Sequence, residues 1–84
     1  MYIHLGEHIS INDINVIGVF DLENTTIGQD TRAYLSRLEQ EGKAVNVSPE
    51  MPKSFVVCIE NGEEVAYISS ISVATLRKRA LTPF

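Results

Sequence analysis

The sequence has few of the residues that chemical sites usually need. Among its 84 residues are one cysteine, two histidines and no tryptophan. A single cysteine excludes a disulfide within the chain and fits a reducing compartment. Cys58 lies in an apolar segment, which favours a buried, inert thiol, because a reactive thiol needs surroundings that lower its pKa. We therefore expect Cys58 to belong to the core.

Basic residues are also scarce. Seven Lys and Arg stand against eleven Asp and Glu, giving a formal net charge of −4. The chain as a whole therefore lacks the positive charge of a typical nucleic-acid-binding domain. Three of the seven cations are nevertheless consecutive: Arg77, Lys78 and Arg79. The charge pattern predicts a basic end on an acidic body.

Long apolar runs are absent. No segment is long enough to span a bilayer, and Met1 to Glu7 lack the basic region and apolar core of a signal peptide. The hydrophobic fraction of 44% is too high for a disordered chain. We expect one cytoplasmic domain over residues 1–80, no membrane partner, and a frayed tail over residues 81–84.

A hairpin is the clearest local feature that the sequence does contain. Asn61-Gly62 separates two runs rich in β-branched and aromatic residues, 55–59 and 65–68. A two-residue primed turn needs positive φ at both central positions, which Asn and Gly tolerate best. Three acids surround this turn, and we expect them to form a charged hairpin tip: Glu60, Glu63 and Glu64.

One helix is predicted between Thr26 and Gly42. Thr26 and Gln29 have the spacing of a capping box, and Gly42 has the position of a residue that ends a helix. Apolar and aromatic residues recur at helical spacing in between, which gives one buried stripe. The stripe consists of Ile27, Thr31, Tyr34, Leu35 and Leu38.

The remaining segments read as short strands and a second helix. Alternation predicts strands at 2–5 and 8–11, and the nearly continuous apolar run 14–22 predicts a strand covered on both sides. Gly18 indicates a bulge in that strand. Another strand is expected at 44–48, and a short C-terminal helix capped by Ser70 or Ser72. The fold class is therefore α+β, with a small, mostly antiparallel sheet of about five to six short strands.

No catalytic or cofactor-binding arrangement is evident. The serines lie at strand ends and caps, and no Gly-rich phosphate loop, Cys–His pair or paired carboxylates occur. His4, Glu7 and His8 are close in sequence, but their spacing crosses a strand and a turn, so surface histidines are favoured over a metal site. We expect a protein that is not an enzyme and that carries no cofactor and no metal.

The basic run has two interpretations. Cations in the last turn of a helix are stabilised by its dipole, by about 0.3–1 kcal/mol each, and need no further role. Alternatively, Arg77, Lys78 and Arg79 contact phosphates, with Lys53 from the proline-framed loop 48–53 on the same surface. These four residues are the candidate DNA-binding site.

Taken as an ordered set, segments from Met1 to about Arg79 resemble the RemA/RemB family of bacterial extracellular-matrix (biofilm) regulators, on the RemB side. The resemblance rests on Met1-Tyr2-Ile3-His4-Leu5-Gly6, Val19-Phe20-Asp21-Leu22, Thr25-Thr26, Asp30-Thr31-Arg32, Glu41-Gly42-Lys43, Val45-Asn46-Val47-Ser48, Pro52-Lys53-Ser54-Phe55-Val56-Val57-Cys58, Tyr67-Ile68-Ser69 and Thr75-Leu76-Arg77-Lys78-Arg79. The family implies a cytoplasmic, DNA-binding transcriptional regulator that works as a ring-like homo-oligomer.

One loop departs from the family pattern. RemA-type sequences carry adjacent arginines before the hairpin, which are implicated in DNA contact, whereas this chain reads Glu50-Met51-Pro52-Lys53-Ser54. Only Lys53 replaces those arginines. Two hypotheses therefore remain: an oligomeric DNA-binding regulator, or an acidic interaction module without useful DNA affinity that partners a related basic regulator.

Overall fold

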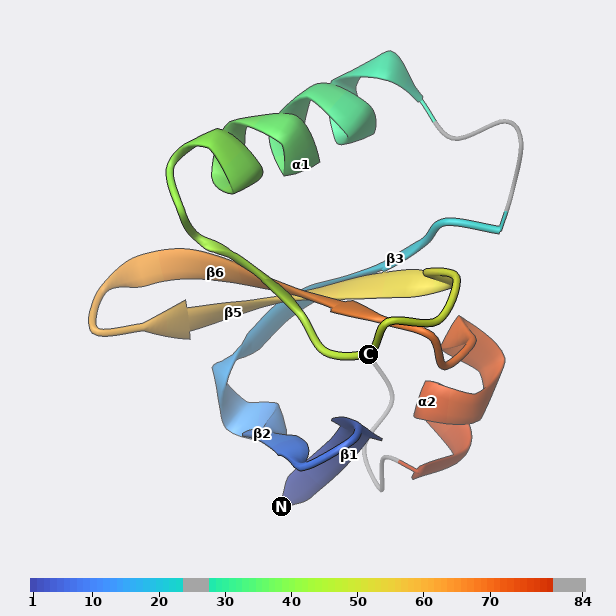
Figure 1. Ribbon diagram of the computed structural model, residues 1–84. Coiled ribbons are helices and arrows are strands. Elements are labelled where there is room, and N and C mark those ends of the chain that lie inside the picture. Colours follow the sequence, from blue (N-terminus) through green and yellow to red (C-terminus); the bar gives the residue numbers. More distant parts are fainter. Residues whose placement is uncertain (24–27, 80–84) are drawn as a thin grey trace.

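The chain folds as an α+β domain with six strands, one main helix and a short C-terminal helix, as predicted (Figure 1). The computed structural model describes residues 1–23 and 28–79. The expected tail at 81–84 lies outside the described residues. The elements are β1 (Tyr2–Gly6), β2 (Ile9–Asn12), the 3₁₀ turn η1 (Asp13–Asn15), β3 (Val16–Asp21), α1 (Gln29–Gln40), β4 (Ala44–Asn46), β5 (Ser54–Glu60), β6 (Glu63–Ser69) and α2 (Val73–Arg79).

The strands form two sheets, where one was expected. β1 and β2 make a separate antiparallel hairpin, and the other strands make a four-stranded sheet in the order β3-β5-β6-β4. The separation has a local cause at η1, where the Asn12 side chain accepts a hydrogen bond from the Ile14 N–H and turns the chain. In the larger sheet only β4 pairs in parallel, with β6.

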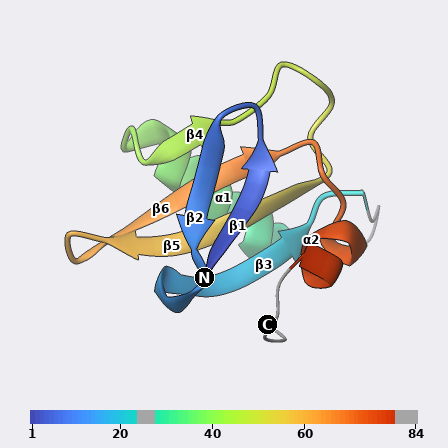
Figure 2. The ribbon, with the colours of Figure 1, turned by 90° about the horizontal axis from the view of Figure 1, so that it is seen from below.

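Two layers cover the larger sheet. α1 lies on one face, while the β1–β2 hairpin and α2 lie on the other (Figures 1 and 2). Each face has its own buried cluster, and β5 contributes alternate residues to both, as a central strand does. The α1 side contains Leu38, Phe55, Val57, Ala66 and Ile68. The opposite side contains Ile3, Leu5, Ile11, Val47, Val56, Cys58 and Leu76, which confirms Cys58 as a core residue.

The predicted hairpin is confirmed. β5 and β6 pair antiparallel from Ser54↔Ser69 to Glu60↔Glu63, around a two-residue turn. Asn61 and Gly62 adopt φ of 53° and 78°, the positive values that a primed turn requires. The acidic tip therefore extends from one end of the sheet.

The C-terminal boundary of α1 is confirmed, and its N-terminal boundary is not. Gly42 has φ of 73°, and the Lys43 N–H donates to the Leu38 carbonyl at 2.8 Å, as in a Schellman ending. At the other end Gly28 is the N-cap and Gln29 is the first helical residue. The predicted capping box, with Thr26 as the N-cap and Gln29 at the third helical position, was therefore wrong. Thr26 and Ile27 lie outside the described residues.

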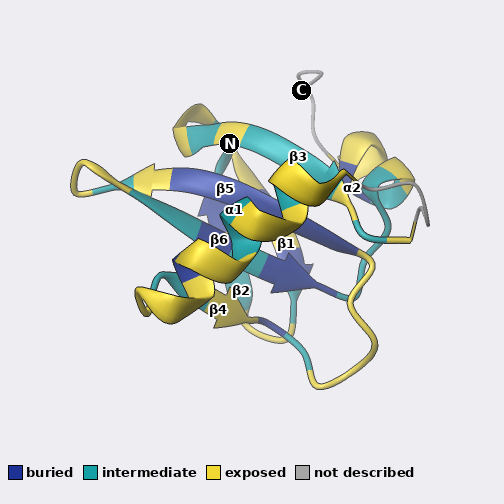
Figure 3. Cartoon of the chain, turned by 90° about the horizontal axis from the view of Figure 1, so that it is seen from above, coloured by how far each residue is buried: buried dark blue, intermediate teal, exposed yellow. Residues whose placement is uncertain are grey.

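The strand predicted from residue 14 begins at Val16, and it is not covered on both sides. Ile14 is 82% exposed and Ile17 is 55% exposed. The reason is topological, because β3 is an outer strand with one neighbour, β5. Figure 3 shows this contrast between buried β5 and half-buried β3. The bulge indicated by Gly18 is confirmed by a register shift between Val16 and Gly18.

Neither helix within the described residues has the length and apolar composition needed to cross a membrane.

Candidate nucleic-acid interface

The basic run Arg77-Lys78-Arg79 forms the last turn of α2. Ser72 caps this helix, because its Oγ accepts a hydrogen bond from the Thr75 N–H at 3.2 Å. Ser72, rather than Ser70, is thus the capping residue that the sequence left open. The cap and the basic last turn both favour helix at this point of the chain.

Burial of Leu76 fixes the direction of the three cations. Leu76 is 1% exposed and packs into the cluster beneath β1 and β2. Successive helical residues are rotated by about 100°, so Lys78 lies roughly opposite Leu76 and faces solvent. Arg77 and Arg79 then lie on the two flanks of the helix. The run is therefore not one patch, and its members have different surroundings.

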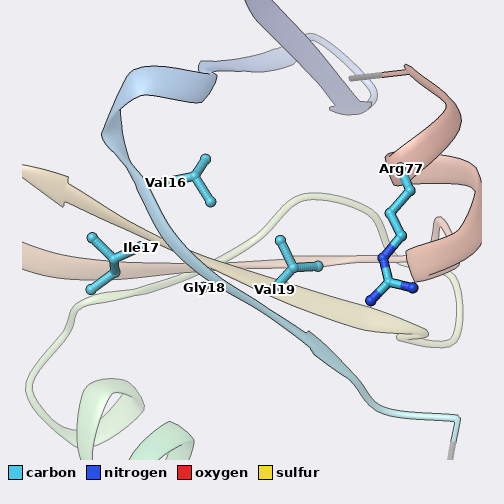
Figure 4. Close-up of a pocket in the computed structure, with 5 residues that line it drawn as sticks. All are labelled: Val16, Ile17, Gly18, Val19 and Arg77. Atoms are coloured by element: carbon cyan, nitrogen blue, oxygen red, sulfur yellow. The ribbon is translucent and has the colours of Figure 1, made fainter. Parts of the chain in front are cut away.

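The two arginines contact different strands. Arg79 Nη1 donates to the backbone carbonyl of His4 in β1 at 3.1 Å. Arg77 instead lines a shallow pocket along β3, together with Val16, Ile17, Gly18 and Val19. Figure 4 shows the Arg77 side chain extending from α2 toward this strand. Arg79 is thus partly engaged in holding the fold, whereas the Arg77 guanidinium lies at the outer strand of the sheet.

Lys53 lies at the same end of the sheet as α2. Its N–H donates to the Ser69 carbonyl at 2.8 Å, and its carbonyl accepts from the Leu22 N–H at 2.9 Å. These bonds place it between the ends of β3 and β6, close to the first residues of α2, and its side chain is exposed. The structure therefore brings Lys53 beside the N-terminal part of α2, and not beside its basic last turn.

The candidate cations differ from Arg37 and Lys43 in their pairing. Lys43 lies 3.7 Å from a Glu41 oxygen and 3.5 Å from a Glu63 oxygen, and Arg37 lies 3.8 Å from Glu64. Within 1–23 and 28–79, in contrast, no carboxylate lies within salt-bridge distance of five exposed cations. These are Arg32, Lys53, Arg77, Lys78 and Arg79, of which Arg79 donates to the His4 carbonyl instead. Charges that are not neutralised internally remain available to an anionic partner.

The acids of the hairpin tip have partners of their own. Tyr34 Oη donates to Glu64 Oε2 at 2.8 Å, and Tyr67 Oη donates to Glu60 Oε2. Burial and, next, the hydrogen bond to Glu64 raise the pKa of Tyr34 to about 12. Because β5 runs from Ser54 to Glu60, the acidic tip and Lys53 lie at opposite ends of this strand. An anionic partner near Lys53 thus approaches away from the acidic tip.

The histidines lie on the surface, as expected. His4 and His8 are exposed, and His4 Nε2 donates to the backbone carbonyl of Glu7 at 3.0 Å. In the part of the chain that the structure describes, no three His, Cys, Asp or Glu side chains are placed to hold a metal ion.

Two features of this region were not predicted from the sequence. Arg32 in α1 is a further exposed cation, and it has no ion pair with any residue that the structure describes. Its position in a predicted helix, next to the turn-rich segment, was the only signal for it in the sequence. The exposed apolar residues Ile14 and Ile17 were predicted as buried. An apolar run alone does not distinguish an outer strand from a central one.

Comparison with known proteins gives one clear relative. No protein-family model matches the chain. Over 80 residues the chain is 34% identical to extracellular matrix regulatory protein B of Bacillus subtilis (strain 168). The matched region covers 95% of this chain and 90% of that protein.

Proposed function

The chain belongs to the family of extracellular matrix regulatory protein B, and on this basis we propose that it is a bacterial transcriptional regulator of extracellular-matrix genes. It acts in the cytoplasm, without catalysis or a cofactor, by binding DNA as a homo-oligomer. The relative's name supplies only the regulatory role.

The observation that carries DNA binding is the set of exposed cations with no carboxylate partner in the described part of the chain. Lys78 faces solvent opposite the buried Leu76, and Lys53 is exposed at the same end of the sheet. Lys side chains that neutralise phosphates release counterions, which provides affinity without sequence readout. We propose Lys53 and Lys78 as the principal phosphate contacts. Arg77 and Arg79 add positive potential from the two flanks of α2.

Assembly compensates for the small number of contacts in one chain. A chain of 9.3 kDa buries a modest share of its surface, and two exposed lysines bind DNA weakly. Repeating the same contacts around a closed homo-oligomer such as a ring multiplies their weak affinities through effective concentration. The acidic net charge then matters less, because only one face of each copy meets the duplex.

Recognition of DNA sequence is expected to be indirect. α2 has seven residues and carries no Asn or Gln, and its two arginines lie against β1 and β3 and not on the solvent face with Lys78. We propose that DNA shape and repeated contacts, rather than base readout in a groove, select the site.

The experiment that tests this proposal compares two double variants with the same change in net charge. Lys53→Ala/Lys78→Ala removes the two proposed phosphate contacts. The matched control, Arg37→Ala/Lys43→Ala, removes two cations that are held by Glu64, Glu41 and Glu63. Measured by fluorescence anisotropy on promoter DNA, the affinity of the first variant should be roughly tenfold lower. The slope of log affinity against log salt concentration should be smaller by about 0.9 per lost contact. An equal loss of DNA affinity in both double variants would contradict the assignment of Lys53 and Lys78 as the phosphate contacts.

A second candidate function is favoured by the acids. Glu60, Glu63 and Glu64 surround the hairpin tip, and Glu50 precedes Lys53 in the loop where the family's arginines are missing. Such a surface suits a basic partner, and the second proposal is an interaction module that binds a related basic regulator. Tight DNA binding by the purified chain, together with a pull-down that returns no specific protein, would reject this alternative.

A further inference from the structure

β3 has an open edge on the side that faces away from β5. It is an outer strand of the larger sheet, with β5 as its one neighbouring strand. Across this pair the Leu22 N–H donates to the Lys53 carbonyl at 2.9 Å. Since backbone groups alternate in direction along an antiparallel strand, Phe20 and Gly18 also point theirs toward β5, and Val19 points its N–H and C=O outward. Among residues 1–23 and 28–79, no turn or loop backbone bonds to Val19.

A pocket lies beside this edge, between β3 and α2. It has a volume of about 180 Å³ and is lined by Val16, Ile17, Gly18, Val19 and Arg77. Val16 and Val19 pack against the cluster beneath the β1–β2 hairpin, so they face the same side of the sheet as α2. An apolar cavity of about 150 Å³ holds a benzene molecule. This pocket therefore has room for one aliphatic side chain.

Arg77 gives the pocket one charged end. Its side chain reaches from α2 to β3, with the guanidinium on the Val19 side of the pocket (Figure 4). No carboxylate in the described part of the chain lies within salt-bridge distance of it. Asp21, further along β3, accepts a hydrogen bond from the Glu23 N–H at 2.8 Å. An open strand edge, an apolar pocket and an exposed guanidinium thus lie along one groove.

These three features together suit an extended peptide segment. A strand added at an open edge gains backbone hydrogen bonds, and its alternate side chains reach pockets on one side. A DNA phosphate bonds to a guanidinium, but it neither fills an apolar pocket nor pairs with the Val19 backbone. A second copy of this chain also lacks one feature, because its other outer strand, β4, has no carboxylate between Ala44 and Asn46.

We propose that the groove between β3 and α2 binds an extended segment of a partner protein, with an aliphatic side chain in the pocket and a carboxylate at Arg77. The segment adds a strand beside Val19. Side chains on the same face of a strand are two positions apart, so the acidic residue comes two positions before or after the aliphatic one. This site is separate from Lys53 and Lys78, and it adds a protein partner to the proposed regulator.

The test uses a short labelled peptide that alternates threonine with two valines and a glutamate. Both sequence orders are made, because the added strand can run in either direction, and fluorescence anisotropy identifies the order that binds. Arg77→Gln should lower the affinity for this peptide about tenfold or more, since a charge-assisted hydrogen bond is lost. Arg32→Gln, the same change at an exposed position of α1, should leave the affinity unchanged. Replacing the peptide's glutamate by glutamine should weaken binding to the unmodified protein and not to Arg77→Gln.

Methylation of the peptide's backbone tests the added strand itself. Amides that face β3 alternate with amides that face away from it. A peptide methylated at the valine and glutamate nitrogens and one methylated at the threonine nitrogens should therefore differ, and only one of them should lose its affinity. Circular dichroism establishes that both protein variants are folded.

Several results would overturn this site. They are absence of binding in both sequence orders, an equal loss in Arg32→Gln, and equal effects of the two methylated peptides. Without peptide binding, a loss of self-association in Arg77→Gln would assign the groove to a second copy, and a loss of promoter-DNA affinity would assign it to phosphate. DNA binding by the unmodified protein is measured separately and decides the proposed function, whatever the peptide result.

Discussion

Nη1 of Arg79 lies 3.1 Å from the backbone carbonyl oxygen of His4, and this hydrogen bond joins the last turn of α2 to the first strand. Its neighbour Lys78 faces solvent and has no such partner among the residues that the structure describes. Two adjacent cations of one basic run thus have different roles, one in the fold and one in the proposed contact with phosphate. This difference can be measured.

Arg79→Ala should mainly lower stability, whereas Lys78→Ala should mainly lower DNA affinity. Loss of the Arg79 hydrogen bond lowers the free energy of unfolding by about 0.5–1.5 kcal/mol, since the contact is exposed. Lys78→Ala should leave stability within about 0.5 kcal/mol and weaken DNA binding more than Arg79→Ala does. Urea unfolding and anisotropy on the same two proteins measure both quantities. Equal DNA affinity in the two variants would contradict the separate roles.

Leu76 should be the residue on which the position of α2 depends most. It is 1% exposed and packs into the cluster with Ile3, Leu5 and Val56. Leu76→Ala is expected to cost about 2–5 kcal/mol, which is a large share of the stability of so small a domain. Met51→Ala, at an exposed loop position, serves as the control and should change little. A loss below about 1 kcal/mol for Leu76→Ala would show that α2 is not anchored there.

Ser69 should be more important than its size suggests. Its buried hydroxyl donates to the Leu5 carbonyl at 2.6 Å and accepts from the Ile71 N–H at 3.0 Å. Ser69→Ala leaves both backbone groups without this partner and should cost about 1–3 kcal/mol in urea unfolding. Ser36→Ala, on the exposed face of α1, should be neutral or slightly stabilising. Equal stability of both variants would contradict the predicted role of Ser69.

Stability should fall at alkaline pH, partly through Cys58. Burial, followed by the nearby Glu60 charge, raises the pKa of its thiol from 9.0 to about 11. A raised pKa means that the folded protein holds the proton more tightly. The contribution of the Cys58 thiol to stability is therefore fully present below about pH 9 and is lost as the pH rises toward about 11. Between these pH values, the unfolding free energy of the unmodified protein should fall more steeply with pH than that of Cys58→Ala. The difference in slope should correspond to up to about one bound proton. Identical slopes would place the thiol in contact with water.

Local backbone chemistry is the part of the fold that the sequence predicts well. Asn61-Gly62 specified the turn between β5 and β6, and Gly42 specified the end of α1, because both positions need positive φ. Cys58 and its apolar neighbours indicated a strand with a buried thiol. In each case the determining interaction lies within a few residues of the chain.

Features that depend on distant neighbours were not predictable in the same way. The apolar run from Ile14 has the same composition whether its strand is central or outer, and only the order β3-β5-β6-β4 makes Ile17 exposed. The four candidate cations are exposed, but their grouping depends on the burial of Leu76 and on the contact of Arg79 with His4. The DNA-contact assignment itself remains a prediction.

The most direct test of the central claim is fluorescence anisotropy of the unmodified protein on a matrix-gene promoter duplex, titrated at several salt concentrations. The proposed regulator should bind at low salt and weaken steeply as salt rises, with a slope of about 0.9 per phosphate contact. Absence of binding even at low salt would contradict DNA binding and leave the acidic interaction module as the function.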